Sequence, residues 1–204
     1  MRNLTTTLYL TLVLLLGSTG ASWGNDFLKG LNAYHSGDFA TALREWKPLA
    51  EQGDPPSQYN LGFMHYKGEG VPQDYKTAVK WYTLAAEQGH ADGQFRLGVM
   101  YWSGKGVLQD YKAAVKWYTL AAEQGDSNAQ NTLGVMYANG RRVPEDLVYA
   151  HMWYNLAASN GSEMAEALRC LVEEKMTLSQ IEEAQALARE FEENQRLVSG
   201  TSIH

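Results

Sequence analysis

The chain has 204 residues, of which 45% are hydrophobic, 11% aromatic and 20% charged, a balance that suits one folded domain or repeat array with a continuous core. The formal net charge is −6, from 23 acidic and 17 basic residues. Nucleic acids are bound by clustered Lys and Arg, and the sequence has no basic run, so we expect no nucleic-acid partner.

The first residues have the layout of a secretory signal peptide. Arg2 precedes an apolar stretch at 8–16, and small residues follow at 17–21. The apolar stretch is shorter than the about 20 residues of a membrane span, and no Cys follows it that could carry a lipid. We therefore expect a signal peptide at 1–21, with cleavage as late as residue 24. The mature protein is then exported, periplasmic or secreted, and meets the membrane only transiently; the alternative is an uncleaved N-terminal anchor.

Residues 25–56 contain two helical patterns. The connection between them is very short, since Asp38 directly follows Gly37. The later units carry five more residues at this point, between Gly68 and Asp74. We expect 25–56 to be a shortened, degenerate unit that caps the N-terminal end of a repeat array.

The middle of the chain repeats with a period of 36 residues. The phrase QDYKTAVKWYTLAAEQG at 73–89 returns at 109–125 with a single change, Thr77 to Ala113. Such a period, with two helical patterns in each unit, predicts an all-α solenoid. We expect three repeats within 57–165, with boundaries at 57–92, 93–128 and 129–164.

Each repeat is expected to contain two helices. The second helix, for example 74–88, begins at an Asp that can cap its free backbone N–H groups. It ends at Gly89, where a left-handed conformation is tolerated. Small and aromatic side chains share one face of this helix. The tryptophans that recur on it are predicted to be core residues: Trp81, Trp117 and Trp153.

The first helix of each repeat, about 57–67 in the first, carries a Leu-Gly pair. Gly in mid-helix costs roughly 1 kcal/mol relative to Ala, so its recurrence at Gly62, Gly98 and Gly134 indicates a close approach of the paired helix. His65 stands where the other repeats have Tyr and is interpreted as a core substitute.

After the repeats, 166–196 is expected to form C-terminal capping helices, and 197–204 a flexible tail. Thr177 and Gln180 have the spacing of a capping box, and a stripe of apolar residues follows. Cys170, the single cysteine, is predicted to be a small packed residue, since its helix shows no activating neighbour. The alternatives are a reactive thiol or an intermolecular bridge.

The segment LGFMHYKGEGVPQDYKTAVKWYTLAAEQG at 61–89 resembles a Sel-1-like repeat, a longer relative of the tetratricopeptide repeat. LGVMYWSGKGVLQDYKAAVKWYTLAAEQG at 97–125 fits better, whereas LGVMYANGRRVPEDLVYAHMWYNLAASNG at 133–161 has Arg142 in place of the second loop Gly. The resemblance implies a right-handed α/α superhelical solenoid of the exported bacterial type. It also implies that 25–56 is a tetratricopeptide-like cap.

Two copies of the repeat, 58–93 and 94–129, are identical at 23 of 36 positions, and the second helix accounts for one of the 13 differences. The outward stripe of the first helix varies instead. The resemblance implies that this stripe lies along the concave groove of the solenoid. The residues of the stripe are therefore the partner-binding candidates: Tyr59, Phe63, Tyr66, Phe95, Trp102, Asn131 and Asn139. The competing interpretation is that Tyr59, Phe63 and Phe95 pack between helices, while Tyr66, Trp102 and Asn139 are exposed.

No catalytic, cofactor-binding or metal site is predicted. The loops GEGVPQ at 68–73 and GKGVLQ at 104–109 join two helices, whereas a dinucleotide loop follows a strand. The His residues lack the paired spacing of a metal site. The pairs Glu173–Glu174 and Glu182–Glu183 are expected on solvated outer faces of helices.

The leading interpretation is a non-enzymatic, exported interaction module, an adaptor, scaffold or regulator that holds a peptide or protein partner. A first alternative is a cell-wall or β-lactam hydrolase, an activity linked to relatives that carry a cysteine pair in each repeat; this chain has no such pair. A second alternative is a structural component that self-associates into a homo-oligomer.

Overall fold

The computed structural model describes residues 24–198 and residue 200, and all regular structure in this part of the chain is helical. The predicted signal peptide lies outside the described residues. Among the described residues, none of the helices has both the length and the apolar character that spanning a membrane requires. The chain divides into two compact units, Met1–Gln88 and Gly89–His204.

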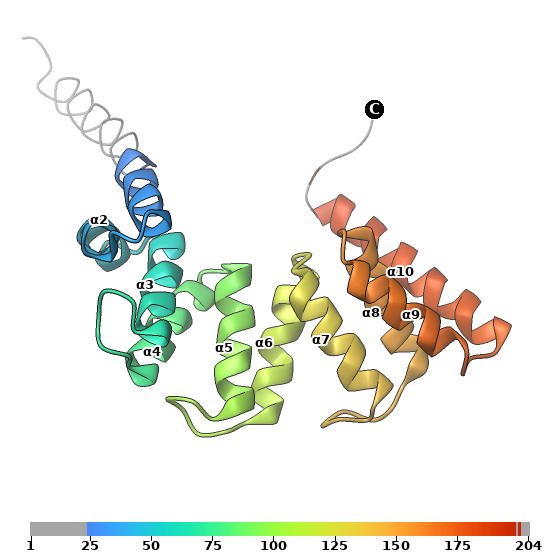
Figure 1. Ribbon diagram of the computed structural model, residues 1–204. Helices are drawn as coiled ribbons and strands as arrows, with labels where there is room; N and C mark the ends of the chain where they lie inside the picture. Colours follow the sequence, from blue (N-terminus) through green and yellow to red (C-terminus); the bar gives the residue numbers. More distant parts are fainter. Residues whose placement is uncertain (1–23, 199, 201–204) are drawn as a thin grey trace, which may run out of the picture. The chain divides into compact units, whose positions relative to one another are not determined.

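The first unit consists of a helical segment at 24–35 and three helices of equal length (Figure 1). These are α2 (Phe39–Glu51), α3 (Pro55–Lys67) and α4 (Tyr75–Glu87). Each packs against the next along the chain. The core lies between them and centres on Trp46, which is 1% exposed and is surrounded by small and apolar side chains.

The second unit contains two helix pairs followed by two further helices (Figure 1). The pairs are α5 (Ala91–Ser103) with α6 (Tyr111–Glu123) and α7 (Ser127–Ala138) with α8 (Leu147–Ser159). α9 (Glu163–Glu173) and α10 (Leu178–Val198) both pack against α8. This all-α architecture of 36-residue helix pairs, with capping helices after the repeats, confirms the predicted fold class.

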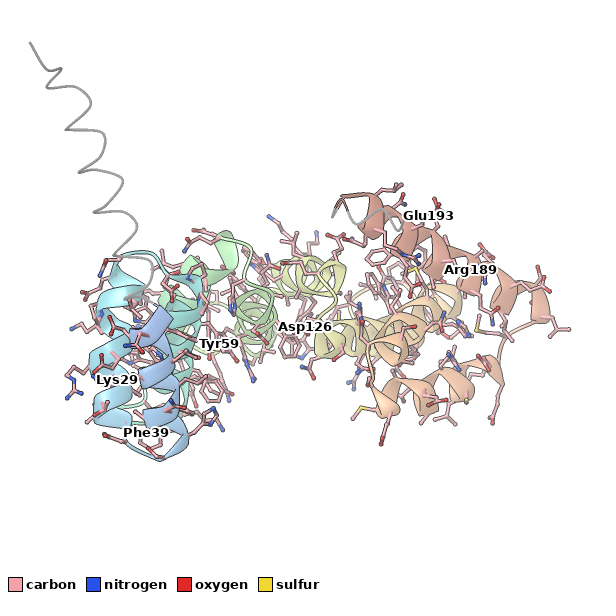
Figure 2. The ribbon with its side chains drawn as sticks, turned by 90° about the horizontal axis from the view of Figure 1, so that it is seen from above. Lys29, Phe39, Tyr59, Asp126, Arg189 and Glu193 are labelled. Carbon is pink, nitrogen blue, oxygen red and sulfur yellow. The ribbon has the colours of Figure 1, made fainter. Side chains whose placement is uncertain are left out.

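α10 covers the last repeat with one face and exposes the other. Ala184 and Ala188 are buried, and the Phe191 ring meets the Trp153 ring edge-on, with centroids 5.6 Å apart. Figure 2 shows Arg189 and Glu193 on this helix, where both side chains are exposed. The helix begins at the predicted capping box: the Thr177 backbone N–H donates to Gln180 Oε1 at 2.9 Å, and the Gln180 N–H donates to Thr177 Oγ1 at 3.3 Å.

The second helix of every repeat begins at the predicted Asp cap. The Asp74 carboxylate accepts from the N–H groups of Lys76 and Thr77, Asp110 caps α6 in the same way, and Asp146 caps α8 through the Tyr149 N–H. First helices are capped as well: Asp126, labelled in Figure 2, accepts from the Ala129 N–H at 2.7 Å. Burial raises the pKa of the Asp126 carboxyl, because desolvation outweighs the hydrogen bonds that favour its charged form.

The mid-helix glycines mark close approaches of the paired helix, as predicted. A Cβ atom placed on Gly62 would lie 2.7 Å from the Tyr82 ring, and one on Gly134 would lie 2.5 Å from the Tyr154 ring. These rings are among the most buried side chains of the protein. Desolvation accordingly raises the pKa of Tyr154 to about 12.

A recurring polar contact inside each repeat was not anticipated from the sequence. Gln58, Gln94 and Gln130 are buried on the first helices. The side-chain oxygen of each accepts a hydrogen bond from an amide at the end of the second helix of the same repeat. The donors are Gln88 at 2.7 Å, Gln124 at 2.7 Å and Asn160 at 3.1 Å. Burying an unpaired amide is costly, so these bonds allow a polar side chain in an apolar interface.

Two predictions about burial, for Trp117 and Cys170, are corrected by the structure. Trp153 is 6% exposed and lies in the core, and Trp81 is half-buried and packs against the core of the first unit, but Trp117 is only half-buried. Cys170 is exposed rather than packed, because α9 turns that face to solvent. His65 is half-buried, as are Tyr101 and Tyr137 at the same place in the other repeats, and desolvation lowers the pKa of its imidazole.

Glu173 does not lie on a solvated face as predicted. Its Oε1 accepts a hydrogen bond from Nε2 of His151, at 2.7 Å, and His151 is fully buried in α8. The Arg169 guanidinium lies 3.4 Å from the same carboxylate and donates to Asn155 at 2.9 Å. This group of side chains ties α9 to α8, which explains why a Glu on α9 turns inward. The partner residue Glu174 is exposed.

Candidate partner-binding surface

The predicted candidates in the first unit are aromatic side chains that pack on one another and remain half-buried. The rings of Tyr59 (labelled in Figure 2) and Phe63 stack at 6.4 Å, and Tyr59 also meets the Tyr82 ring at 6.0 Å. Tyr66 is half-buried rather than exposed, and its ring lies 5.5 Å from that of Tyr75. Tyr59 and Phe63 therefore contribute to packing, and a role of all three in binding stays a prediction.

The candidates in the second unit separate into packing residues and surface residues. Phe95 is half-buried, with its ring centroid 5.7 Å from that of Tyr118. Asn131 donates to the Ser162 hydroxyl at 2.8 Å. Asn139 is exposed, as expected, and its amide donates to the Val135 carbonyl at 2.8 Å. Trp102 is half-buried rather than exposed, and it alone of the candidates lines the hollow described next.

The hollow lies where the α5–α6 helix pair meets the loop between α7 and α8. It has a volume of about 470 Å³ and is lined by two aromatic residues and three loop residues: Trp102, Tyr111, Gly140, Arg141 and Arg142. The Trp102 ring meets the Tyr111 ring edge-on, with centroids 4.9 Å apart. We call this cavity the Trp102 hollow.

Arg142 reaches back across the hollow to the preceding repeat. Its guanidinium carbon lies 4.1 Å from the centroid of the Tyr111 ring, the distance of a cation–π contact. A cation–π contact uses the charge of the guanidinium and not its hydrogen-bond donors, so N–H groups of Arg142 can still donate to a ligand. Arg141 is exposed next to it.

The Arg142 backbone adopts an unusual conformation for a residue with a side chain. Its φ is +64°, and it is the only non-Gly residue with positive φ in the part of the chain that the structure describes. Glycine fills the corresponding positions in the other repeats, Gly70 at +72° and Gly106 at +71°. A residue with a side chain costs roughly 1–2 kcal/mol in this left-handed conformation, so the backbone of the third repeat is strained where Arg142 replaces Gly.

The charge of the hollow is not neutralised from within. Among the described residues, no carboxylate forms an ion pair with Arg141 or Arg142. The nearby Asp110 carboxylate is engaged in capping α6, where it accepts from the N–H groups of Lys112 and Ala113 at 2.9 and 3.0 Å. The residues that line the hollow include two arginines and no acidic residue.

The first unit has a corresponding arrangement of an aromatic pair beside a loop, and there a carboxylate of the protein itself lies next to the aromatic pair. Tyr34 and Phe39 form the aromatic pair, with centroids 5.4 Å apart. The Tyr34 hydroxyl donates a hydrogen bond to the carboxylate of Glu69, which occupies the loop position that Arg141 has in the third repeat. Burial and this bond to Glu69 raise the pKa of Tyr34 well above its usual range.

Sequence reasoning noted Arg142 as a departure from the repeat but did not assign it to a site. The signal was present: 141–142 is the only place in the sequence where two basic residues adjoin, at a loop position filled by Gly in the other repeats. In the part of the chain that is described, His, Cys, Asp and Glu nowhere gather in a group of three or more that could hold a metal ion. The side chains of the hollow suit recognition of an anionic group by cation and aromatic face.

The fold and its repeated contacts define an all-α repeat protein of the solenoid class. The Sel1 repeat family model matches residues 55–90, 91–126 and 127–162, more than half of the chain, and the protein belongs to the Sel1 repeat family. Each matched block begins two residues before the boundary expected from the sequence, at the first residue of α3, α5 or α7. No curated protein matches the chain.

Similar solved structures include the following two. One is a Sel1 repeat protein from Oxalobacter formigenes, with 34% identity and a TM-score of 0.68 over 71% of this chain. The other is c5321, a protective antigen present in uropathogenic Escherichia coli strains that displays an SLR fold, with 39% identity and a TM-score of 0.66 over 74% of this chain. The matches span 60% and 34% of those chains, so this chain corresponds to part of each.

Proposed function

We propose that this protein is an exported, non-catalytic module that binds a protein or peptide partner through the variable faces of its first helices. Sel1 repeat proteins are in general protein–protein interaction modules. Helical solenoids provide extended surfaces for this purpose, and aromatic side chains supply contact area at low entropic cost. Acting as an adaptor, scaffold or regulator, such a module needs no reacting groups of its own.

The proposal rests on a difference between the two helices of a repeat. The second helix is almost unchanged between the first two repeats, and in all three repeats it supplies buried Ala and Tyr side chains. The first helix and its following loop change, and in the second unit these changes place Trp102, Arg141 and Arg142 around one hollow. A surface that varies on a constant scaffold is what a family of binding modules requires.

We expect Trp102→Ala to abolish recovery of the partner that the unaltered protein captures from extracytoplasmic extracts. The substitution removes the largest side chain of the hollow, and aromatic contacts of this size dominate interface energies, often by 2 kcal/mol or more. The measurement is affinity capture with mass spectrometry. Fold retention is checked by circular dichroism.

The matched control is Trp117→Ala, which removes the same side chain from the constant second helix of the same repeat. Trp117 is half-buried and does not line the hollow. Capture by this variant but not by Trp102→Ala supports the proposal. Equal capture by both places the contact elsewhere on the protein. Loss in both, with both variants folded, contradicts a role for the variable face.

Export is tested on the protein itself. If residues 1–21 are removed on secretion, the intact mass of the protein from the extracytoplasmic fraction corresponds to a chain that starts at Ser22, or as late as Asn25. A full-length mass in the cytoplasmic fraction would contradict the export part of the proposal and leave the binding part standing.

A further inference from the structure

We propose that the Trp102 hollow captures a carboxylate of the bound partner, either an acidic side chain or the C-terminus of a peptide. The inference rests on the proposed function, since it names the chemical group that the binding module recognises. Its starting point is the pair of adjoining arginines, which stand beside an aromatic corner and without a carboxylate partner among the described residues.

The geometry suits a planar anion. The contact with Tyr111, at 4.1 Å from ring centroid to guanidinium carbon, places the Arg142 guanidinium at the hollow before any ligand arrives. A guanidinium held in this way can donate two parallel N–H bonds to the two oxygens of a carboxylate. Arg141 adds a second positive charge, and Trp102 gives an apolar wall against which a peptide stem can pack.

The first unit supports the choice of a carboxylate. At the corresponding loop position, Glu69 places its own carboxylate beside the aromatic pair of Tyr34 and Phe39 and accepts the Tyr34 hydroxyl hydrogen bond. The site of the third repeat has cations where the first unit has this acid. The arrangement therefore accommodates a carboxylate supplied internally in one unit and leaves the complementary cations open in the other.

A nucleic acid is a poorer ligand for this place. Binding a phosphate backbone requires a track of several basic groups, whereas the hollow offers two arginines on a protein of net charge −6. Two arginines can bind one anionic group, and the rings of Trp102 and Tyr111 can contact apolar groups of the same ligand. An acidic peptide segment has both features.

The test uses the full mature chain and three short peptide probes. They are an acetylated triglutamate amide, the matching triglutamine amide, and triglutamine with a free C-terminal carboxylate. Binding is followed by the indole N–H signal of Trp102 in NMR titrations, assigned by its loss in Trp102→Phe. We expect the triglutamate amide or the free-acid triglutamine, or both, to shift this signal, and the triglutamine amide to leave it unchanged.

Three variants make the test specific. Arg142→Gln is expected to weaken probe binding about tenfold or more, the loss of a charge-assisted hydrogen bond. Arg142→Gly does the same while restoring Gly at a positive φ, so it folds at least as well as the unaltered chain. The control, Arg189→Gln, makes the same change of charge at an exposed position on α10 and is expected to bind the probes normally (Figure 2).

The probes also identify the source of the carboxylate. Binding of the triglutamate amide assigns acidic side chains, and binding of the free acid alone assigns a C-terminus. Equal binding of all three probes, no shift of the Trp102 signal with any probe, or tighter binding of inorganic phosphate than of the peptides would each overturn the proposal. If Arg142→Gln still captures the partner that Trp102→Ala loses, the carboxylate inference fails and the proposed function stands.

Discussion

Trp46→Ala is expected to lower the free energy of unfolding of the first unit by about 3–5 kcal/mol, the usual cost of deleting a fully buried Trp side chain. Trp46 is 1% exposed and contacts the rings of Phe27 and Tyr34, with centroids 6.2 and 5.6 Å away. Its indole N–H also donates to the Phe27 carbonyl at 3.2 Å, so the substitution leaves that acceptor without this partner.

Urea titrations followed by circular dichroism measure this effect, with hydrogen exchange of α2 and α3 amides as a readout confined to the first unit. Trp117→Ala serves again as the matched control, because the half-buried Trp117 is expected to cost much less. An unchanged unfolding midpoint for Trp46→Ala would show that the helical segment 24–35 does not depend on this side chain. In that case the described core of the first unit would be wrong.

Gly98→Ala is expected to destabilise the second unit by about 1–3 kcal/mol, although Ala is the better helix former by about 1 kcal/mol. The reason is steric. A Cβ on Gly98 would lie 2.7 Å from two atoms of the Tyr118 ring and 3.3 Å from the Ala114 carbonyl oxygen. Tyr118 is 3% exposed, so its ring has little room to move away.

Two further variants isolate the steric cause. Ala167→Gly, at an exposed position of α9, reports the helix propensity difference alone. Tyr118→Leu makes room at the contact, so the double variant Gly98→Ala/Tyr118→Leu should lose less stability than the sum of the two single changes. A stabilising effect of Gly98→Ala, measured by the urea midpoint, would sink the interpretation that Gly is required by helix approach.

The features that sequence reasoning predicted correctly are local. An Asp before a helical pattern caps that helix through bonds that span two or three residues, as at Asp74, and the left-handed Gly89 after α4 depends on the backbone of one turn. Because the sequence repeats every 36 residues, an assignment made for one repeat applies to all three. The close approach at Gly62 could also be predicted, because only a neighbouring helix explains Gly in the middle of a helix.

The predictions that failed depend on which other element covers a face. Trp117 follows the same pattern as Trp153, but α10 packs against α8, which carries Trp153. Cys170 and Glu173 lie on one helix, where the pattern alone does not tell which face meets α8. The Trp102 hollow could not be predicted, because it depends on the loop conformation at Arg142, where the third repeat departs from the pattern. That loop brings the Arg142 guanidinium beside Tyr111 of the preceding repeat, a contact that only the structure shows.

The buried glutamines bear on how such a chain can lengthen. Each of Gln58, Gln94 and Gln130 has its amide oxygen bonded by a residue of its own 36-residue block, so a tandem copy of one block brings the partner along with the polar group. A newly duplicated block would meet this hydrogen-bonding requirement from its first generation. Gene duplication can thus extend the array without a compensating substitution at these positions, and the loops of the added copy are free to acquire a new ligand preference.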